Sequence, residues 1–217
     1  MDETTTMRDR RAAGKIFTEA PDMTKESLAG KRLAWRFNRL RPGEYKKGAR
    51  ILRKLFGSMG KKCWIEPPLN VCYGSNVHIG DYFYANMNLT LVDDWEIRIG
   101  DDVMIAPNVT IAVTGHPLDH ERRMHGAMYA FPVTIGDFVW ICAGAIILPG
   151  VTIGARSVIG AGSVVTRDIP EGVLAAGNPC RVIRAITDRD REFYYHEMRF
   201  DDAPVRDSSA STPPGEA

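Results

Sequence analysis

The chain has 217 residues, of which 44% are hydrophobic and 25% are charged, and its formal net charge is +1. This length allows one or two domains with a buried core, and the composition excludes an intrinsically disordered chain. The charge is unevenly distributed, since residues 1–62 carry 17 Lys and Arg against 7 Asp and Glu, whereas residues 63–217 carry 11 against 20.

Residues 1–62 are expected to form a helical cap. Their basic side chains alternate at helical spacing with apolar ones such as Leu33, Phe37, Ile51 and Leu55. This pattern is typical of amphipathic helices with a solvated basic face, so we expect no nucleic-acid partner and no membrane partner.

The sequence predicts a cytoplasmic protein. The N-terminal segment MDETTTMRDRRAAGK lacks the apolar region of a signal peptide, and Gly and Pro interrupt the uncharged stretch 138–155, which argues against a membrane helix. The cysteines form no C-x-x-C pair and are expected to be free thiols at Cys63, Cys72, Cys142 and Cys180.

The second half of the chain has a six-residue period. Aliphatic residues recur without a break at Ile135, Ile141, Ile147, Ile153, Ile159 and Val165. Six residues are about 1.67 turns of an α-helix, so a helix would scatter these side chains around its surface. Short strands separated by corners would point all of them inward, which predicts a mainly β, three-sided parallel β-helix over residues 63–186.

The same period appears earlier and is interrupted twice. It runs through Ile79, Ala85, Leu91 and Ile97, then slips by two residues to Ile99, which predicts a bulged corner between Ile97 and Ile99. Residues 114–132 do not fit the period and are expected to project as a loop, the usual place for function on a solenoid. We expect a C-terminal helix over 187–202 and a disordered tail over 203–217.

The residues suited to proton chemistry gather at the two interruptions. Asp93 and Asp94 lie at the first, and His116 opens the second. An imidazole can accept a proton near neutral pH, which makes His116 a candidate general base. The plainer interpretations are a loop imidazole bonded to its own backbone and two turn-forming aspartates. A nucleophilic role for Cys72 or Cys142 is a further alternative, although neither has a histidine nearby in the sequence.

Four segments resemble the galactoside O-acetyltransferases of the nodulation, maltose and galactoside branch of hexapeptide acyltransferases. They are YGSNVHIGDYFYANMNLTLVDD, IGDDVMIAPNVTIAVTGHP, MYAFPVTIGDFVWI and GAGSVVTRDIPEGVLAAGNPCRVIR, with AGKIFT at the front. The resemblance runs from about residue 11 to residue 200. It implies left-handed parallel β-helices assembled as a homotrimer, with acetyl-CoA in a groove between subunits and no metal.

The resemblance also implies roles for particular residues. His116 matches the general base that takes a proton from a sugar hydroxyl, so that the oxygen attacks the thioester directly. Oxyanion donors are expected around Ala85 and Asn86, and Asn86 is also expected to touch the ligands. The expected acceptor-binding residues are Glu19, Cys72, Asn86, Asp94 and Met128. The expected coenzyme-binding residues are Asn86, Ala143, Ala161, Thr166, Arg167, Arg181 and Arg184.

The chain departs from the family pattern at several positions. Glu19 is one methylene longer than the family's acidic residue, and Cys72 replaces a serine with a poorer hydrogen-bond partner. Ala143, Arg167 and Ala127 replace a serine, a lysine and an acidic residue, respectively. The first two departures concern the identity of the acceptor rather than the catalytic base.

Three alternative functions remain open at this stage. The acceptor could be maltose or another sugar. A carbonic-anhydrase-like trimer would need histidines such as His78, His120 and His125 to hold zinc between subunits. A non-catalytic scaffold is the third alternative, because a fold does not dictate a function.

Overall fold

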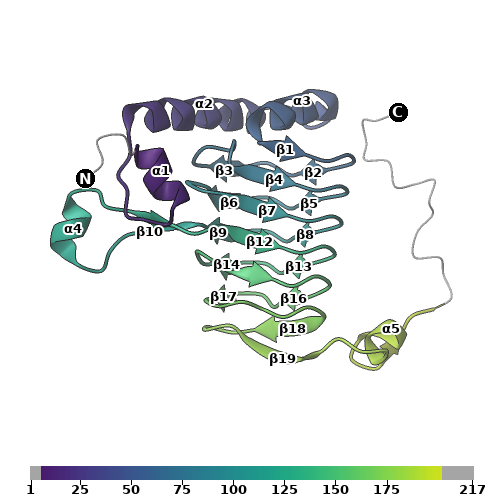
Figure 1. The fold of residues 1–217 in the computed structure, drawn as a ribbon. Helices are drawn as coiled ribbons and strands as arrows, with labels where there is room; N and C mark the ends of the chain where they lie inside the picture. The colour runs from purple at the N-terminus through teal and green to yellow at the C-terminus, as the bar shows by residue number, and fades with distance from the viewer. Residues whose placement is uncertain (1–5, 202–217) are drawn as a thin grey trace.

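The six-residue period builds three parallel sheets that form the sides of a prism (Figure 1). The structure is a computed structural model and describes residues 6–201. The first sheet contains β1 (Ser58–Met59), β4 (Val77–Ile79), β7 (Ile97–Ile99), β12 (Val133–Ile135) and β15 (Thr152–Ile153). The second contains β2 (Trp64–Ile65), β5 (Tyr84–Ala85), β8 (Met104–Ile105), β13 (Trp140–Ile141), β16 (Val158–Ile159) and β18 (Val173–Ala176), and it ends with β19 (Arg181–Ala185), which is antiparallel to β18. The third contains β3 (Leu69–Val71), β6 (Leu89–Val92), β9 (Thr110–Ala112), β14 (Ile146–Ile147) and β17 (Val164–Val165). The parallel β-solenoid expected from the repeat is therefore confirmed.

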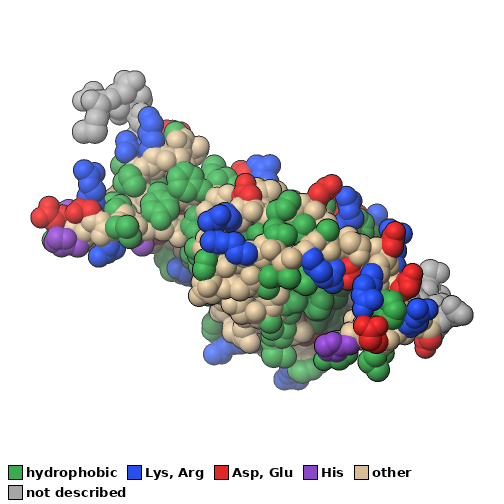
Figure 2. Space-filling model, turned by 90° about the horizontal axis from the view of Figure 1, so that it is seen from below, with side chains coloured by type: hydrophobic (Ala, Val, Ile, Leu, Met, Phe, Trp, Pro, Cys, Tyr) green, Lys and Arg blue, Asp and Glu red, His purple; other side chains and the backbone are tan. Residues whose placement is uncertain are grey.

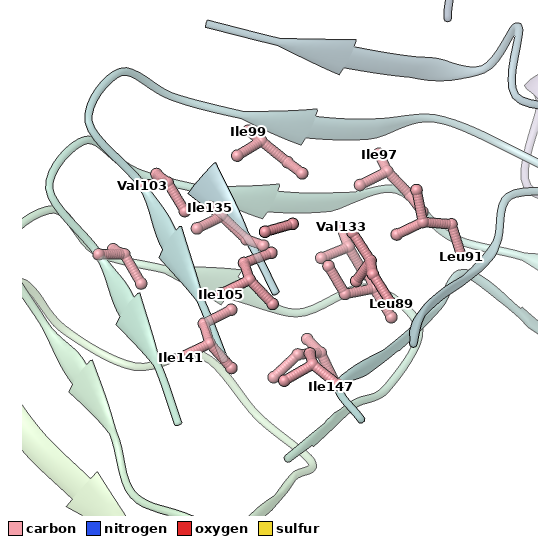
Figure 3. Packing of buried hydrophobic residues seen from close by; sticks show 14 of the residues in the cluster. Leu89, Leu91, Ile97, Ile99, Val103, Ile105, Val133, Ile135, Ile141 and Ile147 are labelled. Carbon is pink, nitrogen blue, oxygen red and sulfur yellow. The ribbon is translucent and has the colours of Figure 1, made fainter. Parts of the chain in front are cut away.

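The core is a column of aliphatic side chains in register from coil to coil (Figure 3). Ile105 pairs with Ile141, and Ile141 pairs with Ile159 in the second sheet. The third sheet stacks Ile111, Ile147 and Val165 in the same way. Since inward and outward side chains alternate along a strand, the outer faces and the edges are left free for chemistry.

The prediction of a bulged corner between Ile97 and Ile99 is wrong. Both residues lie on β7, point inward and pair in register with the neighbouring coils. Thr90 pairs with Thr110, a spacing of 20 residues, whereas Ile146 pairs with Val164, a spacing of 18. The early coils therefore carry two more residues than the later ones, and the turn from Asp93 to Glu96 accommodates them between β6 and β7.

A helical cap covers the N-terminal end of the prism (Figure 1). Its helices α2 (Pro21–Phe37) and α3 (Tyr45–Leu55) lie over that end, whereas α1 (Met7–Ala12) lies beside the coils. The Asn38 side chain donates to the carbonyl of Leu69 and accepts from its N–H, each at 2.8 Å, so it acts as a strand partner for the open edge of the third sheet. A Cβ at Gly30 would lie 1.7 Å from the Tyr73 carbonyl oxygen, so α2 packs directly on the turn that contains Tyr73.

The inserted residues 114–132 project from the edge between the third and first sheets (Figures 1 and 2). They form an antiparallel pair, β10 (Thr114–Gly115) with β11 (Tyr129–Ala130), and the short helix α4 (His120–Met124). Charged and histidine side chains lie at the tip, which Figure 2 shows standing apart from the prism.

The prediction of a C-terminal helix over 187–202 is wrong. Only α5 (Arg189–Glu192) is helical, and it is followed by a hairpin of β20 (Phe193–Tyr195) and β21 (Met198–Arg199). No side chain caps α5, and the aromatic run Phe193 to Tyr195 favours a strand. The predicted disordered tail, 203–217, lies outside the described residues.

No helix within residues 6–201 is both long enough and apolar enough to cross a membrane.

Candidate active site

The His116 imidazole is oriented by a single hydrogen bond within the inserted loop. Its Nδ1 lies 2.9 Å from the carbonyl oxygen of Ala127. A carbonyl oxygen only accepts, so Nδ1 carries the hydrogen, and in the neutral ring Nε2 is then an acceptor. The bond uses the backbone of Ala127, so the departure from the family's acidic side chain at this position leaves the orientation of His116 unaffected.

Two backbone pairings fix this part of the loop, one within the loop and one to the N-terminal segment. Gly115 pairs with Tyr129 in the β10–β11 hairpin, where a Cβ on Gly115 would lie 2.4 Å from the Tyr129 hydroxyl oxygen. On the other side, Phe17 and Met128 exchange N–H to carbonyl hydrogen bonds of 2.8 and 2.9 Å. The extended arm between α1 and α2 is thereby fixed beside His116, and it brings Glu19 to the same edge of the prism.

An acidic, partly apolar cluster lies next to the loop at the edge between the third and first sheets. Cys72 and Met128 pack against a buried group that consists of Phe17, Met23, Tyr73 and Ala130. Burial and the Asp94 carboxylate raise the pKa of Tyr73, and Glu19 raises it further. Four expected acceptor-binding residues, Glu19, Cys72, Asp94 and Met128, therefore lie in the neighbourhood of Tyr73, and together they are called the acceptor cluster. Tyr73 was not singled out from the sequence, although it follows Cys72 directly.

Asp93 and Asp94 have different environments. Asp93 is fully buried and accepts three backbone hydrogen bonds, from Cys72 at 2.8 Å, Tyr73 at 3.0 Å and Gly74 at 2.6 Å. Burial raises its pKa to about 6, and the three N–H donors oppose that rise. Asp93 therefore shapes the turn beneath the cluster. Asp94 is only half-buried, and its carboxylate raises the pKa of both Tyr73 and Cys72.

The cysteine thiols are poor candidates for a nucleophile. Burial, together with Asp94 and Asp93, raises the pKa of Cys72 to about 12, and burial raises the pKa of Cys142. The thiolate is the reactive form, so both side chains stay protonated and unreactive near neutral pH. All four cysteines are free thiols.

Small residues line a second edge, between the second and third sheets. Ala143 and Ala161 are exposed and stacked one coil apart, and the Gly162 N–H donates to the Ala143 carbonyl at 2.9 Å. A Cβ at Gly162 would meet no atom within 4 Å, so the surface along this edge is open.

Asn86 lies on the same edge, two coils above Ala143. Its backbone N–H donates to the Ile105 carbonyl, and its Oδ1 accepts from the Met87 N–H at 2.7 Å. The Nδ2 group lies on the other side of the side-chain amide, directed away from the Met87 N–H. The Ala85 side chain is fully buried in the core, so this residue offers the edge nothing beyond its backbone.

The cationic residues of the C-terminal coils are exposed and differ in their partners. Arg181 and Arg184 lie on β19, while Thr166 and Arg167 lie on the far edge of the third sheet after β17. Arg184 forms a two-point ion pair with Asp190, with distances of 2.6 and 2.7 Å, and this pair holds its guanidinium in place.

Within one chain, the expected site residues therefore lie on two different edges of the prism. His116 and the acceptor cluster lie on the edge between the third and first sheets, whereas Asn86, Ala143 and Ala161 lie on the edge between the second and third sheets. The third sheet stands between the two groups.

Within the part of the chain that the structure describes, no three His, Cys, Asp or Glu side chains form a group that could hold a metal ion.

Known proteins resemble this chain over most of its length. The family model for bacterial transferase hexapeptides (six repeats) matches residues 132–167, and the maltose acetyltransferase hexapeptide capping motif matches residues 10–60. The galactoside O-acetyltransferase of Escherichia coli (strain K12) is 53% identical over 89% of this chain and 96% of that protein.

Two solved structures share the fold at substantial sequence identity. A galactoside acetyltransferase in complex with coenzyme A superposes with a TM-score of 0.89 at 52% identity, covering 90% of this chain and 98% of that one. A hexapeptide-repeat containing acetyltransferase from Vibrio cholerae O1 biovar eltor, complexed with acetyl coenzyme A, gives a TM-score of 0.78 at 33% identity, covering 84% and 100%.

Asp93→Asn should destabilise the fold. An amide has only one acceptor oxygen, so its NH₂ group would face an N–H that now bonds to a carboxylate oxygen, and we expect a loss of about 1–3 kcal/mol in the free energy of unfolding. Denaturant titration at a fixed protein concentration measures it. Asp94→Asn is the matched control, because no side-chain hydrogen bond ties Asp94 to the turn, and equal losses in the two variants would contradict this role for Asp93.

Proposed function

Because this chain belongs to the hexapeptide-repeat O-acetyltransferases, the family of the galactoside and maltose enzymes, we propose that it transfers acetyl from acetyl-CoA to a sugar hydroxyl with His116 as general base. Membership of this acyltransferase family rests on the similarity to the relatives and family models described above. The role of His116, the choice of acceptor and the assembly are inferences from the geometry of the site.

The observation that carries the proposal is the hydrogen bond from His116 Nδ1 to the Ala127 carbonyl. It fixes the tautomer in which Nε2 accepts, and a sugar hydroxyl that donates to Nε2 becomes a better nucleophile as its proton is withdrawn. The protonated imidazole that results keeps its bond to Ala127. Because the thiols of Cys72 and Cys142 stay protonated, direct attack by the acceptor oxygen is favoured over an acetyl-enzyme.

The acceptor cluster suits a polyhydroxylated ligand. Carboxylates accept hydrogen bonds from sugar hydroxyls, and Asp94 and Glu19 supply two of them. Met128 and Tyr73 provide an apolar wall beside them. We infer that a galactoside or related sugar binds here. The thiol of Cys72, a weak hydrogen-bond partner, is the position at which this chain's acceptor preference departs from that of its serine-bearing relatives.

The open edge between the second and third sheets fits coenzyme A. Small residues at Ala143, Gly144, Ala161 and Gly162 leave room for a narrow chain, and exposed arginines at the C-terminal end match its phosphates. We assign the pantetheine arm to this edge and the phosphates to Arg181, Arg184 and, from the other edge, Thr166 and Arg167. Bound acetyl-CoA supplies the acetyl group as a thioester. The Asn86 Nδ2 amide is the donor best placed to hold the negative charge that develops on the acetyl oxygen.

A complete site then requires two chains, and we infer a homotrimer. In a closed ring each subunit presents one edge to one neighbour and a different edge to the other, which would join His116 of one subunit to the coenzyme edge of the next. Exposed apolar side chains support such contacts. Leu118, Met124 and Phe131 lie on the loop, whose surface in Figure 2 is largely apolar next to the prism, and Met104 and Trp140 lie on the outside of the second sheet.

The reaction is tested with a panel of acceptors. We expect thiol release from acetyl-CoA to depend on an added galactoside or related sugar, and mass spectrometry should find one acetyl group on a hydroxyl of the product. Thiol release without any acetylated acceptor across the panel would contradict the proposed function.

His116→Ala should lower kcat/KM for acetyl transfer by roughly 10² to 10⁴, because a positioned base contributes that much to a proton transfer. Acetyl-CoA binding, measured by calorimetry, should be retained. His125→Ala is the control, since it removes an exposed imidazole from the same loop. A rate unchanged from wild type would eliminate His116 as the base.

Hybrid assemblies should test the shared site. His116→Ala disables one half-site, and Ala161→Trp should block the coenzyme edge, so each variant alone is expected to be nearly inactive. In trimers formed from equal amounts of the two chains, about a quarter of the sites would combine two intact halves, so about a quarter of the wild-type activity should return. No recovery in hybrids of confirmed mixed composition would place the whole site within one chain.

A further inference from the structure

Arg11 is a buried cation next to the acceptor cluster, and the reaction described above does not use it. It is 4% exposed and is the one buried residue of α1. Its Nη1 donates to the backbone carbonyl of Asp94 at 2.6 Å, and its guanidinium lies over the Trp95 ring at 4.6 Å from the centroid. One side chain therefore holds two consecutive residues of the turn that carries the acceptor-binding carboxylate.

Stability alone does not account for Arg11. Its Nε is buried and has no hydrogen-bond partner among residues 6–201, and burial lowers the pKa of its guanidinium, so the folded state disfavours this charge. The sequence carried no signal for this role, because Arg11 lies in the basic run RDRRAAGK.

The neighbouring Arg8 provides a contrast on the same helix. Its guanidinium bonds to Asp22 at 2.6 Å and to Glu26 at 2.8 Å, and both partners belong to α2. Arg8 thus ties α1 to α2, whereas Arg11 ties α1 to the turn at Asp94. A substitution at Arg8 therefore tests the docking of α1, and a substitution at Arg11 tests the placement of the Asp94 carboxylate.

We propose that Arg11 is a positioning residue for acceptor binding, which fixes the Asp94 backbone through its carbonyl and so aims the Asp94 carboxylate at the sugar hydroxyls. This inference rests on the proposed function, in which Asp94 binds the acceptor. With the tie removed, the carboxylate keeps its charge and loses its fixed direction. The effect falls on the acceptor, because the coenzyme edge lies across the third sheet.

The experiment compares steady-state kinetics of Arg11→Met, Arg11→Lys and Arg8→Met with an acceptor that the wild-type enzyme acetylates. Wild-type turnover with that acceptor tests the proposed function separately. For Arg11→Met we expect the acceptor KM to rise about tenfold, with the acetyl-CoA KM within about twofold of wild type. The variant also loses the hydrogen bond to the Asp94 carbonyl, so its melting temperature is expected to fall, and the split between the two KM values distinguishes positioning from stability. Arg11→Lys keeps the charge and should recover part of the loss, and Arg8→Met should leave the acceptor KM unchanged.

A second comparison tests whether Arg11 acts through Asp94. In the Asp94→Ala background, Arg11→Met should raise the acceptor KM no further, since the carboxylate that it positions is absent. A full additional increase in that background would overturn the proposal, as would an unchanged acceptor KM in Arg11→Met. If Arg11→Met does not fold, Arg11→Lys decides: an acceptor KM equal to that of wild type overturns the proposal, and a rise confined to the acceptor supports it.

Discussion

The stacking of coils in register is the constraint on which the rest of the structure depends. Each short strand buries its inward aliphatic side chain against the equivalent residue one coil away, as Ile105, Ile141 and Ile159 do. Two- or three-residue strands have little stability alone, so each coil relies on its neighbours and on the helical cap. Because the core uses only the inward positions, the three edges and outer faces can vary without loss of the fold.

In the proposed site, the side chains that would meet the acceptor are held in place by polar groups that fix the backbone beneath them. The buried Asp93 carboxylate accepts three backbone N–H bonds from the turn, and the Ala127 carbonyl sets the tautomer of His116. Phe17 pairs with Met128 and so holds the segment between α1 and α2 against the loop. Acceptor binding and base catalysis need groups held in a defined direction, and buried hydrogen bonds provide that rigidity on a loop that would otherwise be mobile.

The distribution of the site between two edges connects assembly to activity. In this proposal a single subunit holds a base with an acceptor cluster on one edge and a coenzyme channel on another. Neither half performs transfer until a neighbour closes the ring. The apolar side chains exposed on the loop and on the second sheet would then be buried by the same contact that completes the chemistry.

The sequence by itself determined the repeat, the solenoid, the helical cap and the position of the inserted loop, because the alternation of inward and outward side chains is local and can be read from spacing. It also singled out His116 as a candidate base. It missed the C-terminal hairpin, since aromatic residues favour a strand only once a partner strand is present. Only the tertiary structure decided which edge each candidate occupies, and that Asp93 is fully buried while Asp94 is half-buried. It also decided that Arg11, alone in the basic run RDRRAAGK, donates to the Asp94 carbonyl. Those outcomes depend on contacts between residues as far apart as 11 and 94, which no local pattern encodes.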